Sequence, residues 1–312
     1  MLSIDKHSHR YKSICILMFC LLYVNESIMF RETFSATVRI IITLIIFAAW
    51  ILYLNGNKAF EKLGIKRNCL YLALVLYVCM ALSWIVNGFY ATFDVWVIYV
   101  IAFAVLFVSQ VRYDEFKEAY TDVMTFLGGT SVVLFLGYKI VPGLYSIFPN
   151  NYWHSGMLIK NCFLCAIPAQ AQNYRNFGIF NEPGHYSVFL VWALIIALFA
   201  TKVDIKKVLI LIIALATTLS TNGILCLVVL IAAFLINRTD ISKKVKRRLG
   251  IGILIVVIVF IAYMVVNPQS LSFLLDKLNE FSLSDSVDNS TSGSGYERFR
   301  ALIYSNFFNF LY

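Results

Sequence analysis

The chain has 312 residues, of which 60% are hydrophobic and only 14% are charged. Soluble globular domains carry about 45–50% apolar and about 25% charged residues. This composition therefore excludes a soluble enzyme, a disordered chain and a secreted disulfide scaffold. Because roughly 20 apolar residues span a bilayer, the sequence predicts an all-α, polytopic integral membrane bundle. The whole chain, residues 1–312, is expected to form a single membrane domain with about ten transmembrane helices.

The spans are expected where apolar residues run without interruption. These runs are found at 13–30, 36–54, 69–86, 91–109, 123–141, 184–201, 207–221, 223–237 and 250–266. A tenth begins near Ala301 and is cut off at Tyr312. Asn25 and Glu26 close the first run, which lacks a small-residue cleavage site, so we interpret it as a true span and not as a signal peptide.

The net charge of +9 is distributed unevenly between alternate connecting segments. Most lysines and arginines fall in segments 1–12, 55–68, 110–122, 202–207 and 238–249. The positive-inside rule places these segments, and with them the N-terminus, in the cytoplasm. Segments 142–183 and 267–300 then form two larger extracytoplasmic loops.

The run 207–237 is the one ambiguous assignment, since it fits either one overlong helix or two short ones. A single helix would move the basic segment 238–249 outside, so the charge rule favours a hairpin. Two arms of about 15 residues reach only about 22 Å each. The turn at 220–223 then lies below the outer interface, lined by protein or water, or reaches the surface because lysines snorkel.

Polar residues gather in segment 173–186, where the first large outer loop enters the sixth span. Pro183 suits the first turn of a helix, and either Asn181 or Glu182 suits its cap. The positive end of that helix would face outward and favour a phosphate, to which Arg175 could add a bidentate fork. Glu182 and His185 are three residues apart and form a candidate acid/base pair. The alternative is a capped interfacial helix with a solvated arginine.

Two further groups of charges are expected on the same side of the membrane. Arg39 and Asp94 each lie about one turn inside a span, near its outer end, and form either a structural ion pair or part of an outward-open polar cavity. Arg298 and Arg300 precede the tenth run, where they contact an anion or anchor a helix at the interface.

Other signals for chemistry are weak. Cys162 and Cys165 lie in the first outer loop, where they either pack as small apolar residues or form a disulfide. The sequence contains no Walker loop, no zinc helix motif and no nucleic-acid module. We therefore expect no metal, no cofactor and no nucleic-acid partner.

The run from Arg175 to Tyr186, Arg-Asn-Phe-Gly-Ile-Phe-Asn-Glu-Pro-Gly-His-Tyr, belongs to a recognisable pattern. It resembles the R-x-x-G-x-F-x-E-P segment of bacterial O-antigen and capsular polysaccharide polymerases of the Wzy type, within the O-antigen polymerase and ligase superfamily. The hairpin turn at 219–223 and the segment 296–298 also resemble that family, and the resemblance covers roughly residues 70–312. The turn departs from the family's usual Ser-Arg-Gly by having Asn222 before its glycine.

The resemblance implies a membrane glycosyltransferase at the outer face of the bacterial cytoplasmic membrane. It would join oligosaccharide repeat units carried on undecaprenyl diphosphate into O-antigen, capsular or exopolysaccharide. Loop 267–300 contains no histidine, which favours a polymerase over a ligase. Because family members continue through further spans, the resemblance also implies a chain truncated at its C-terminus.

Roles for individual residues follow from the same resemblance. The expected ligands of the diphosphate are Arg175, Arg298 and Arg300. The expected cavity-lining residues are Arg39, Asp94 and Asn222. Either Glu182 or His185 would deprotonate the acceptor hydroxyl, and the other would orient it. The expected partners are the lipid bilayer and the chain-length regulator and flippase of the same pathway.

Two other functions fit a polytopic chain of this charge pattern. A transporter or flippase of lipid-linked oligosaccharide predicts internal repeats and charges near the membrane midplane. The sequence has no detectable repeat, and its charged candidates gather toward one side. A non-catalytic envelope assembly protein predicts that the outer arginines tolerate replacement.

Overall fold

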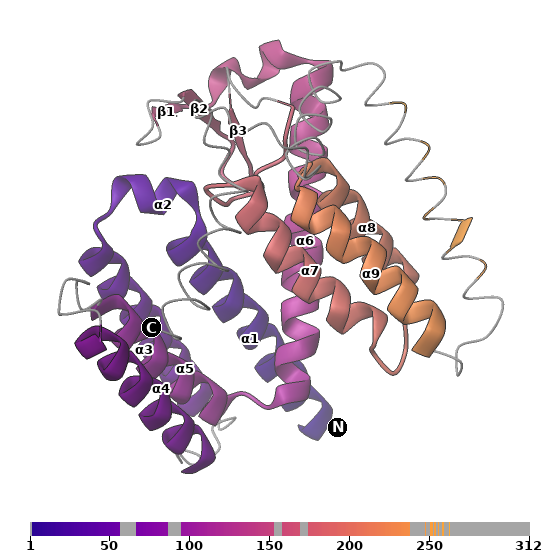
Figure 1. Cartoon of the computed structure of the whole chain (residues 1–312). Helices are drawn as coiled ribbons and strands as arrows, with labels where there is room; N and C mark the ends of the chain where they lie inside the picture. The colour runs from indigo at the N-terminus through magenta and orange to yellow at the C-terminus, as the bar shows by residue number, and fades with distance from the viewer. Residues whose placement is uncertain are drawn as a thin grey trace.

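The computed structural model describes residues 2–56, 67–86, 95–152, 158–168 and 174–237, together with single positions between 247 and 262. The described part is mostly helical (Figure 1). Its first helices are α1 (Leu2–Glu26), α2 (Ile28–Thr33), α3 (Ala36–Gly56), α4 (Arg67–Val86), α5 (Val95–Gln110) and α6 (Tyr113–Ile140). A 3-10 helix, η1 (Pro142–Ile147), and three strands follow, namely β1 (Asn150–Tyr152), β2 (Leu158–Asn161) and β3 (Ala166–Pro168). The last described helices are α7 (Pro183–Leu198), α8 (Ile205–Thr217) and α9 (Thr221–Asn237).

The first eight predicted runs all coincide with helices, and the hairpin within 207–237 is confirmed as α8 and α9. Three helices, α3, α4 and α6, are long and apolar enough to cross a membrane, and several shorter helices are also apolar. The all-α membrane class is therefore supported, while the number of about ten spans stays a prediction. The tenth run and loop 267–300 lie outside the described residues.

Two predicted boundaries are wrong. The first run does not continue to residue 30, because Ser27 takes an extended backbone and caps α2, accepting a hydrogen bond from the Phe30 amide at 3.3 Å. Segment 110–122, predicted as a connection, is helical from Tyr113 onward. Glu115 starts that helix early, because its carboxylate accepts the Arg112 amide at 3.1 Å.

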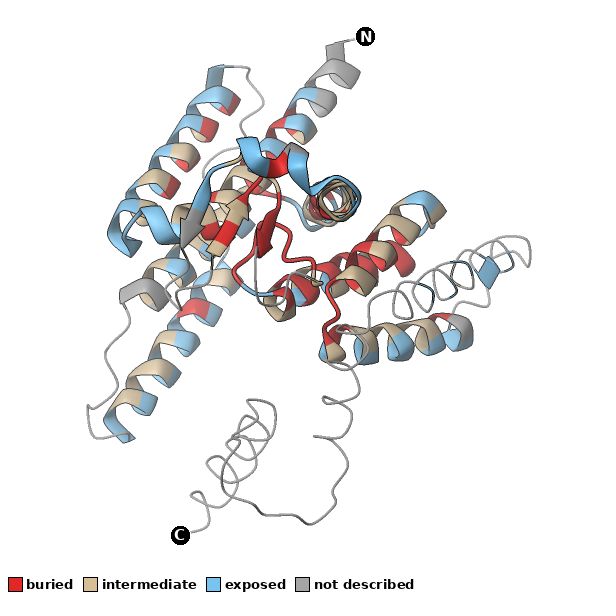
Figure 2. Cartoon of the chain, turned by 90° about the horizontal axis from the view of Figure 1, so that it is seen from above, coloured by how far each residue is buried: buried red, intermediate tan, exposed pale blue. Residues whose placement is uncertain are grey.

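Helix α6 is the centre of the packing, since α1, α7 and α8 all lie against it. Buried residues accordingly concentrate on α6, α7 and α8, as Figure 2 shows. Helix α4 is the opposite case, because among its described side chains only Ala73 is buried. An apolar helix that leaves most of its side chains exposed suits contact with lipid chains.

The outer loop that follows α6 holds a small antiparallel sheet of order β1-β2-β3, which the all-α prediction did not include. The two faces of β2 and β3 pack on different partners because side chains alternate along a strand. Ile159 and Ala166 join Ile28 and Phe177 in one apolar cluster. The other face packs on the end of α6 and on η1, through Cys162, Cys165, Ile167, Phe135 and Tyr145.

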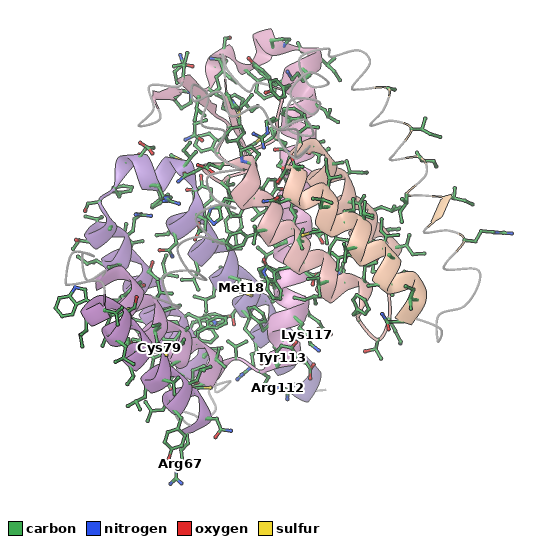
Figure 3. All side chains as sticks on the ribbon, in the orientation of Figure 1. Met18, Arg67, Cys79, Arg112, Tyr113 and Lys117 are labelled. Atoms are coloured by element: carbon green, nitrogen blue, oxygen red, sulfur yellow. The ribbon has the colours of Figure 1, made fainter. Side chains whose placement is uncertain are left out.

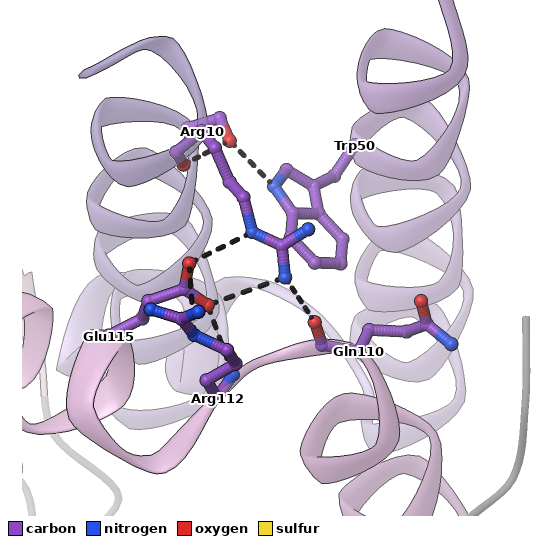
Figure 4. Close-up of polar contacts among 6 residues, drawn as sticks. Arg10, Trp50, Gln110, Arg112 and Glu115 are labelled. Atoms are coloured by element: carbon purple, nitrogen blue, oxygen red, sulfur yellow. Dashed lines mark hydrogen bonds and ion pairs between the residues drawn. The ribbon is translucent and has the colours of Figure 1, made fainter. Parts of the chain in front are cut away.

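The opposite end of the bundle holds a buried ion pair (Figure 4). Arg10 of α1 donates from Nε to Oε1 of Glu115 at 3.0 Å and from Nη2 to Oε2 at 3.3 Å. Nη2 also donates to the Gln110 carbonyl at 2.8 Å. The hydroxyl of Ser13 links this group to Trp50, whose Nε1 donates to it at 3.1 Å. The sequence interpretation treated Arg10 only as one of many cytoplasmic charges.

The same end carries exposed polar side chains. Figure 3 shows Arg112, Tyr113 and Lys117 together at the end of α6 that points away from the sheet. The bundle therefore has one end with basic surface residues and a buried ion pair, and another end built from the sheet and the segment around Arg175.

Candidate functional site

The segment 175–186 crosses the sheet end of the bundle between α1 and β3. The carbonyl of Gly178 accepts a hydrogen bond from the Ala166 amide at 2.6 Å, and the carbonyl of Ile179 accepts one from the Ile28 amide at 2.9 Å. Ser27 and Phe180 form an isolated antiparallel bridge. The segment is therefore tied on both sides to elements that are distant in the sequence.

Gly178 has a structural reason for its place in this segment. Its φ is +55°, a left-handed conformation that glycine adopts without strain. A Cβ at this position would lie 2.7 Å from Cε1 of Tyr186. The Tyr186 ring is itself fully buried and stacks on Phe180 with ring centroids 5.0 Å apart.

The residue after Arg175, Asn176, anchors the segment to two helices. Its Nδ2 donates to Oγ of Ser131 at 3.1 Å and to Oγ1 of Thr217 at 3.0 Å, while its Oδ1 accepts the Gly178 amide at 2.9 Å. Ser131 also shares a hydrogen bond with the Tyr186 hydroxyl at 2.9 Å. Asn176 is fully buried, so its hydrogen bonds fix the backbone position of the adjacent Arg175.

Arg175 lies at the carboxyl end of α8, where its Nε donates to the Thr218 carbonyl at 3.1 Å. A cation at a helix carboxyl end is electrostatically favourable. Burial lowers the pKa of the Arg175 guanidinium to about 10, although electrostatic interactions with Tyr174 and with the Glu182 carboxylate act in the opposite direction. The group therefore stays charged at neutral pH and lies within the field of Glu182.

The amino ends of α7 and α9 meet beside this arginine. Ser187 in the first turns of α7 donates to Oγ of Ser220, the residue before α9, at 3.0 Å. Gly223 permits this approach, because a Cβ there would lie 2.9 Å from Cβ of Ser187. Helix amino ends carry partial positive charge and unpaired amides. With the Arg175 cation nearby, this end of the bundle is suited to an anion such as a phosphate.

The predicted cap and base residues have different surroundings. Glu182 is the N-cap of α7, is exposed, and makes no side-chain capping bond. His185 lies one turn later, with its Nε2 3.6 Å from Oε2 of Glu26 at the end of α1. The carboxylate next to the imidazole thus belongs to Glu26, whereas the sequence interpretation paired His185 with Glu182. Rings of Phe180 and Phe189 flank the imidazole.

A second arm of polar contacts reaches the same carboxylate. Nη1 of Arg31 lies 4.0 Å from Oε2 of Glu26. With the Asn181 amide oriented so that its oxygen faces Arg31, that oxygen accepts from Nε and Nη1 of Arg31 at 2.8 and 2.9 Å. Glu26 is therefore shared by an imidazole and a guanidinium, and Asn181 holds that guanidinium to the segment after Arg175.

The remaining predicted site residues divide into two groups. Arg39 is half-buried in α3, with Nη1 donating to the Asn25 carbonyl at 3.2 Å, and Asn222 is exposed in the first turn of α9. Asp94, Arg298 and Arg300 lie outside the described residues. Their proposed contacts with Arg39 and with a diphosphate stay predictions.

Sequence reasoning did not predict the contacts made by Glu26, Arg31, Asn176 and Ser220. Glu26 ends the first apolar run, which was a usable signal, but nothing local to it points to a histidine far along the chain. Among the described residues, no group of three or more His, Cys, Asp or Glu side chains is placed to hold a metal ion.

Comparison of the chain with models of protein families, with curated proteins and with solved structures finds no match.

Proposed function

We propose that the chain polymerises oligosaccharide repeat units carried on undecaprenyl diphosphate, at the outer face of the bacterial cytoplasmic membrane, with its N-terminus in the cytoplasm. One observation carries the proposal. The sheet end of the bundle combines the Arg175 cation, the paired amino ends of α7 and α9, and the Glu26–His185 pair. Anion-binding groups and an acid/base pair are the two requirements of glycosyl transfer from a lipid diphosphate.

The reaction would proceed by substitution at the donor sugar. The acceptor hydroxyl oxygen forms a bond to the anomeric carbon of the donor, and the bond from that carbon to the diphosphate oxygen breaks. The diphosphate leaves with the electron pair, and the hydroxyl proton passes to the imidazole of His185 or to the carboxylate of Glu182. Glu26 would stabilise the imidazolium that forms in the first case.

Charge on the leaving diphosphate explains the cationic groups. Negative charge grows on it in the transition state, where preorganised cations and helix amino ends stabilise it most. Arg175 is the described candidate for this role, with Arg298 and Arg300 as further proposed ligands. Because the diphosphate is already an activated leaving group, the reaction requires no nucleotide.

The alternatives are a transporter or flippase of the same lipid-linked substrate and a non-catalytic assembly protein. The polar groups of the candidate site lie at the sheet end of the bundle and not near its middle, which favours an enzyme over a transporter. Resemblance of the segment 175–186 to polysaccharide polymerases supports the same choice.

Complementation of a deletion strain tests the proposal. The chain is restored as wild type, Arg175→Ala, Arg175→Lys or Glu182→Gln, and surface glycan is separated by length on a gel. Arg175→Ala should lower polymerisation by about 10²–10³, the typical effect of removing one such stabilising group. Arg175→Lys should restore part of it, because lysine keeps the charge but not the fork. Arg67→Ala, an exposed arginine at the start of α4, is the matched control and should be silent.

Each outcome distinguishes a function. Loss of long chains with single repeat units retained supports polymerisation. Absence of all lipid-linked repeats from the outer face would identify a flippase. Unchanged chain lengths in both alanine and glutamine variants, at wild-type protein levels, would refute the site.

A further inference from the structure

The turn between β2 and β3 brings two cysteines face to face. The strands pair Ile159 with Pro168, Lys160 with Ile167 and Asn161 with Ala166. The next pair in this register is Cys162 with Cys165, and the Cys162 amide donates to the Cys165 carbonyl at 2.9 Å. Residues directly opposite each other in an antiparallel pair have Cα atoms about 4.5–5.5 Å apart. Disulfides most often join residues at this separation.

The two side chains also share one face of the hairpin. Both belong to the apolar cluster beneath η1, with Phe135, Tyr145 and Ile167. Ile159, three positions before Cys162, and Ala166, one position after Cys165, belong to the cluster on the other face. Opposite positions on one face of the hairpin bring the Cα atoms of the two cysteines within the range that disulfides span.

The turn itself is shaped for a close approach. Phe163 has a φ of +60°, and the Leu164 amide donates to the Cys162 carbonyl at 2.6 Å. Oδ1 of Asn161 accepts the Phe163 amide at 3.0 Å. A tight turn of two residues therefore holds the cysteine backbones opposite each other.

We propose that Cys162 and Cys165, which are free thiols in the structure, form an intrachain disulfide in the exported protein. This inference goes beyond polymerisation and rests on the proposed function only for placing the loop outside the cytoplasm, where disulfides persist. The oxidant is a disulfide of an exported oxidoreductase or a small disulfide. One thiolate attacks it and forms a mixed disulfide, and the second attacks the first cysteine sulfur. The two cysteines lose two protons and two electrons, and the oxidant is reduced to a dithiol if it is an oxidoreductase or to two thiols if it is a small disulfide.

Burial determines when the bond forms and how long it lasts. Burial raises the pKa of the Cys162 thiol to about 11 and also raises that of Cys165. Packed thiols are therefore poor nucleophiles, so the thiols react more readily before the hairpin packs against α6. Once formed, the disulfide is shielded from reductants and braces the strand whose Ala166 amide holds Gly178.

The chain offers a direct test by peptide mass. Trypsin cleaves after Lys160 and Arg175, which releases one peptide, 161–175, with Cys162 and Cys165 as its only cysteines. The full-length protein in isolated membranes is denatured in the presence of N-ethylmaleimide, which labels free thiols, and without reductant. It is then digested with trypsin. We expect peptide 161–175 to carry no label and to be lighter by two hydrogen atoms. After prior reduction it should carry two labels.

An internal control comes from peptide 13–31, which also holds two cysteines, Cys15 and Cys20. Both lie on α1, five residues apart and on different sides of the helix, so this peptide should carry two labels without reduction. Cys162→Ser should leave Cys165 unpaired and carrying one label. The wild-type peptide suffices as the test if that variant does not accumulate.

Two results would overturn the proposal. One is a 161–175 peptide that carries two labels in unreduced protein, when a reporter inserted after Phe148 shows that the loop lies outside the cytoplasm. The other is a cytoplasmic signal from that reporter, which would refute the orientation as well. A disulfide without polymerisation would support this inference and reject the polymerase.

Discussion

Replacing Glu115 with glutamine is expected to destabilise the fold strongly. The Glu115 and Arg10 side chains are only 6% and 10% exposed, and they meet through two hydrogen bonds. Removing one partner of a buried ion pair leaves the other charge without compensation, which costs about 3–5 kcal/mol. Glutamine also weakens the cap on the Arg112 amide, which adds up to about 1 kcal/mol. We therefore expect a loss of about 4 kcal/mol in the free energy of unfolding.

A double variant separates the charge from the contact. Arg10→Met with Glu115→Met removes both charges and fills a similar volume, so it should be much more stable than Glu115→Gln alone. Asp122→Asn is the matched control. Asp122 pairs with Lys207, but the two side chains are 35% and 36% exposed, so its loss should cost about 0–1 kcal/mol.

Titration with sodium dodecyl sulfate of the protein in mild detergent micelles, followed by circular dichroism, measures these differences. Equal losses for Glu115→Gln and Asp122→Asn would refute the argument that burial sets the magnitude. A double variant as unstable as Glu115→Gln would show that the contact itself, and not an uncompensated charge, is responsible.

Further predictions concern the segment after Arg175 and use the same titration. Gly178→Ala should cost several kcal/mol, roughly 3, because the added Cβ meets the Tyr186 ring at 2.7 Å and φ is +55°. Gly184→Ala, where a Cβ meets nothing within 4 Å, should instead be neutral or stabilise by up to about 1 kcal/mol, since alanine favours the helix; a similar loss in both variants would contradict the steric argument. Asn176→Ala should cost about 3 kcal/mol, because Ser131 and its buried neighbours lose their hydrogen-bond partner; a loss under about 1 kcal/mol would mean that water replaces the amide.

The helices could be predicted from the sequence because their signal is local. In lipid, an apolar run without charges can satisfy its backbone polar groups only as a helix. The uneven distribution of charge between connecting segments predicted two helices within 207–237, which are α8 and α9. The early start of α6 was missed, since its first turns are polar and depend on Glu115, whose partner Arg10 lies 105 residues away.

The candidate site was only partly predictable for the same reason. Pro183, Glu182 and Arg175 carry local signals of a helix start and of anion binding, and Glu182 is indeed the N-cap of α7. The partner of His185 is Glu26, which belongs to another helix. Spacing of three residues favoured Glu182, because sequence spacing describes neighbours on one helix and not those across an interface.

By itself, then, the sequence determined the apolar helical runs, which support the membrane class, and indicated the segment that we propose for anion binding, since all of these depend on composition and short-range spacing. The tertiary structure alone decided which side chains meet. Packing α1 against α6 paired Arg10 with Glu115. The segment 175–186, which lies between α1 and β3, placed His185 beside Glu26. It also placed Cys162 opposite Cys165 on one face of the β2–β3 hairpin. The two charged pairs depend on how distant segments fit together, and no periodicity along the chain encodes them. The cysteine pair depends on the register of the β2–β3 hairpin.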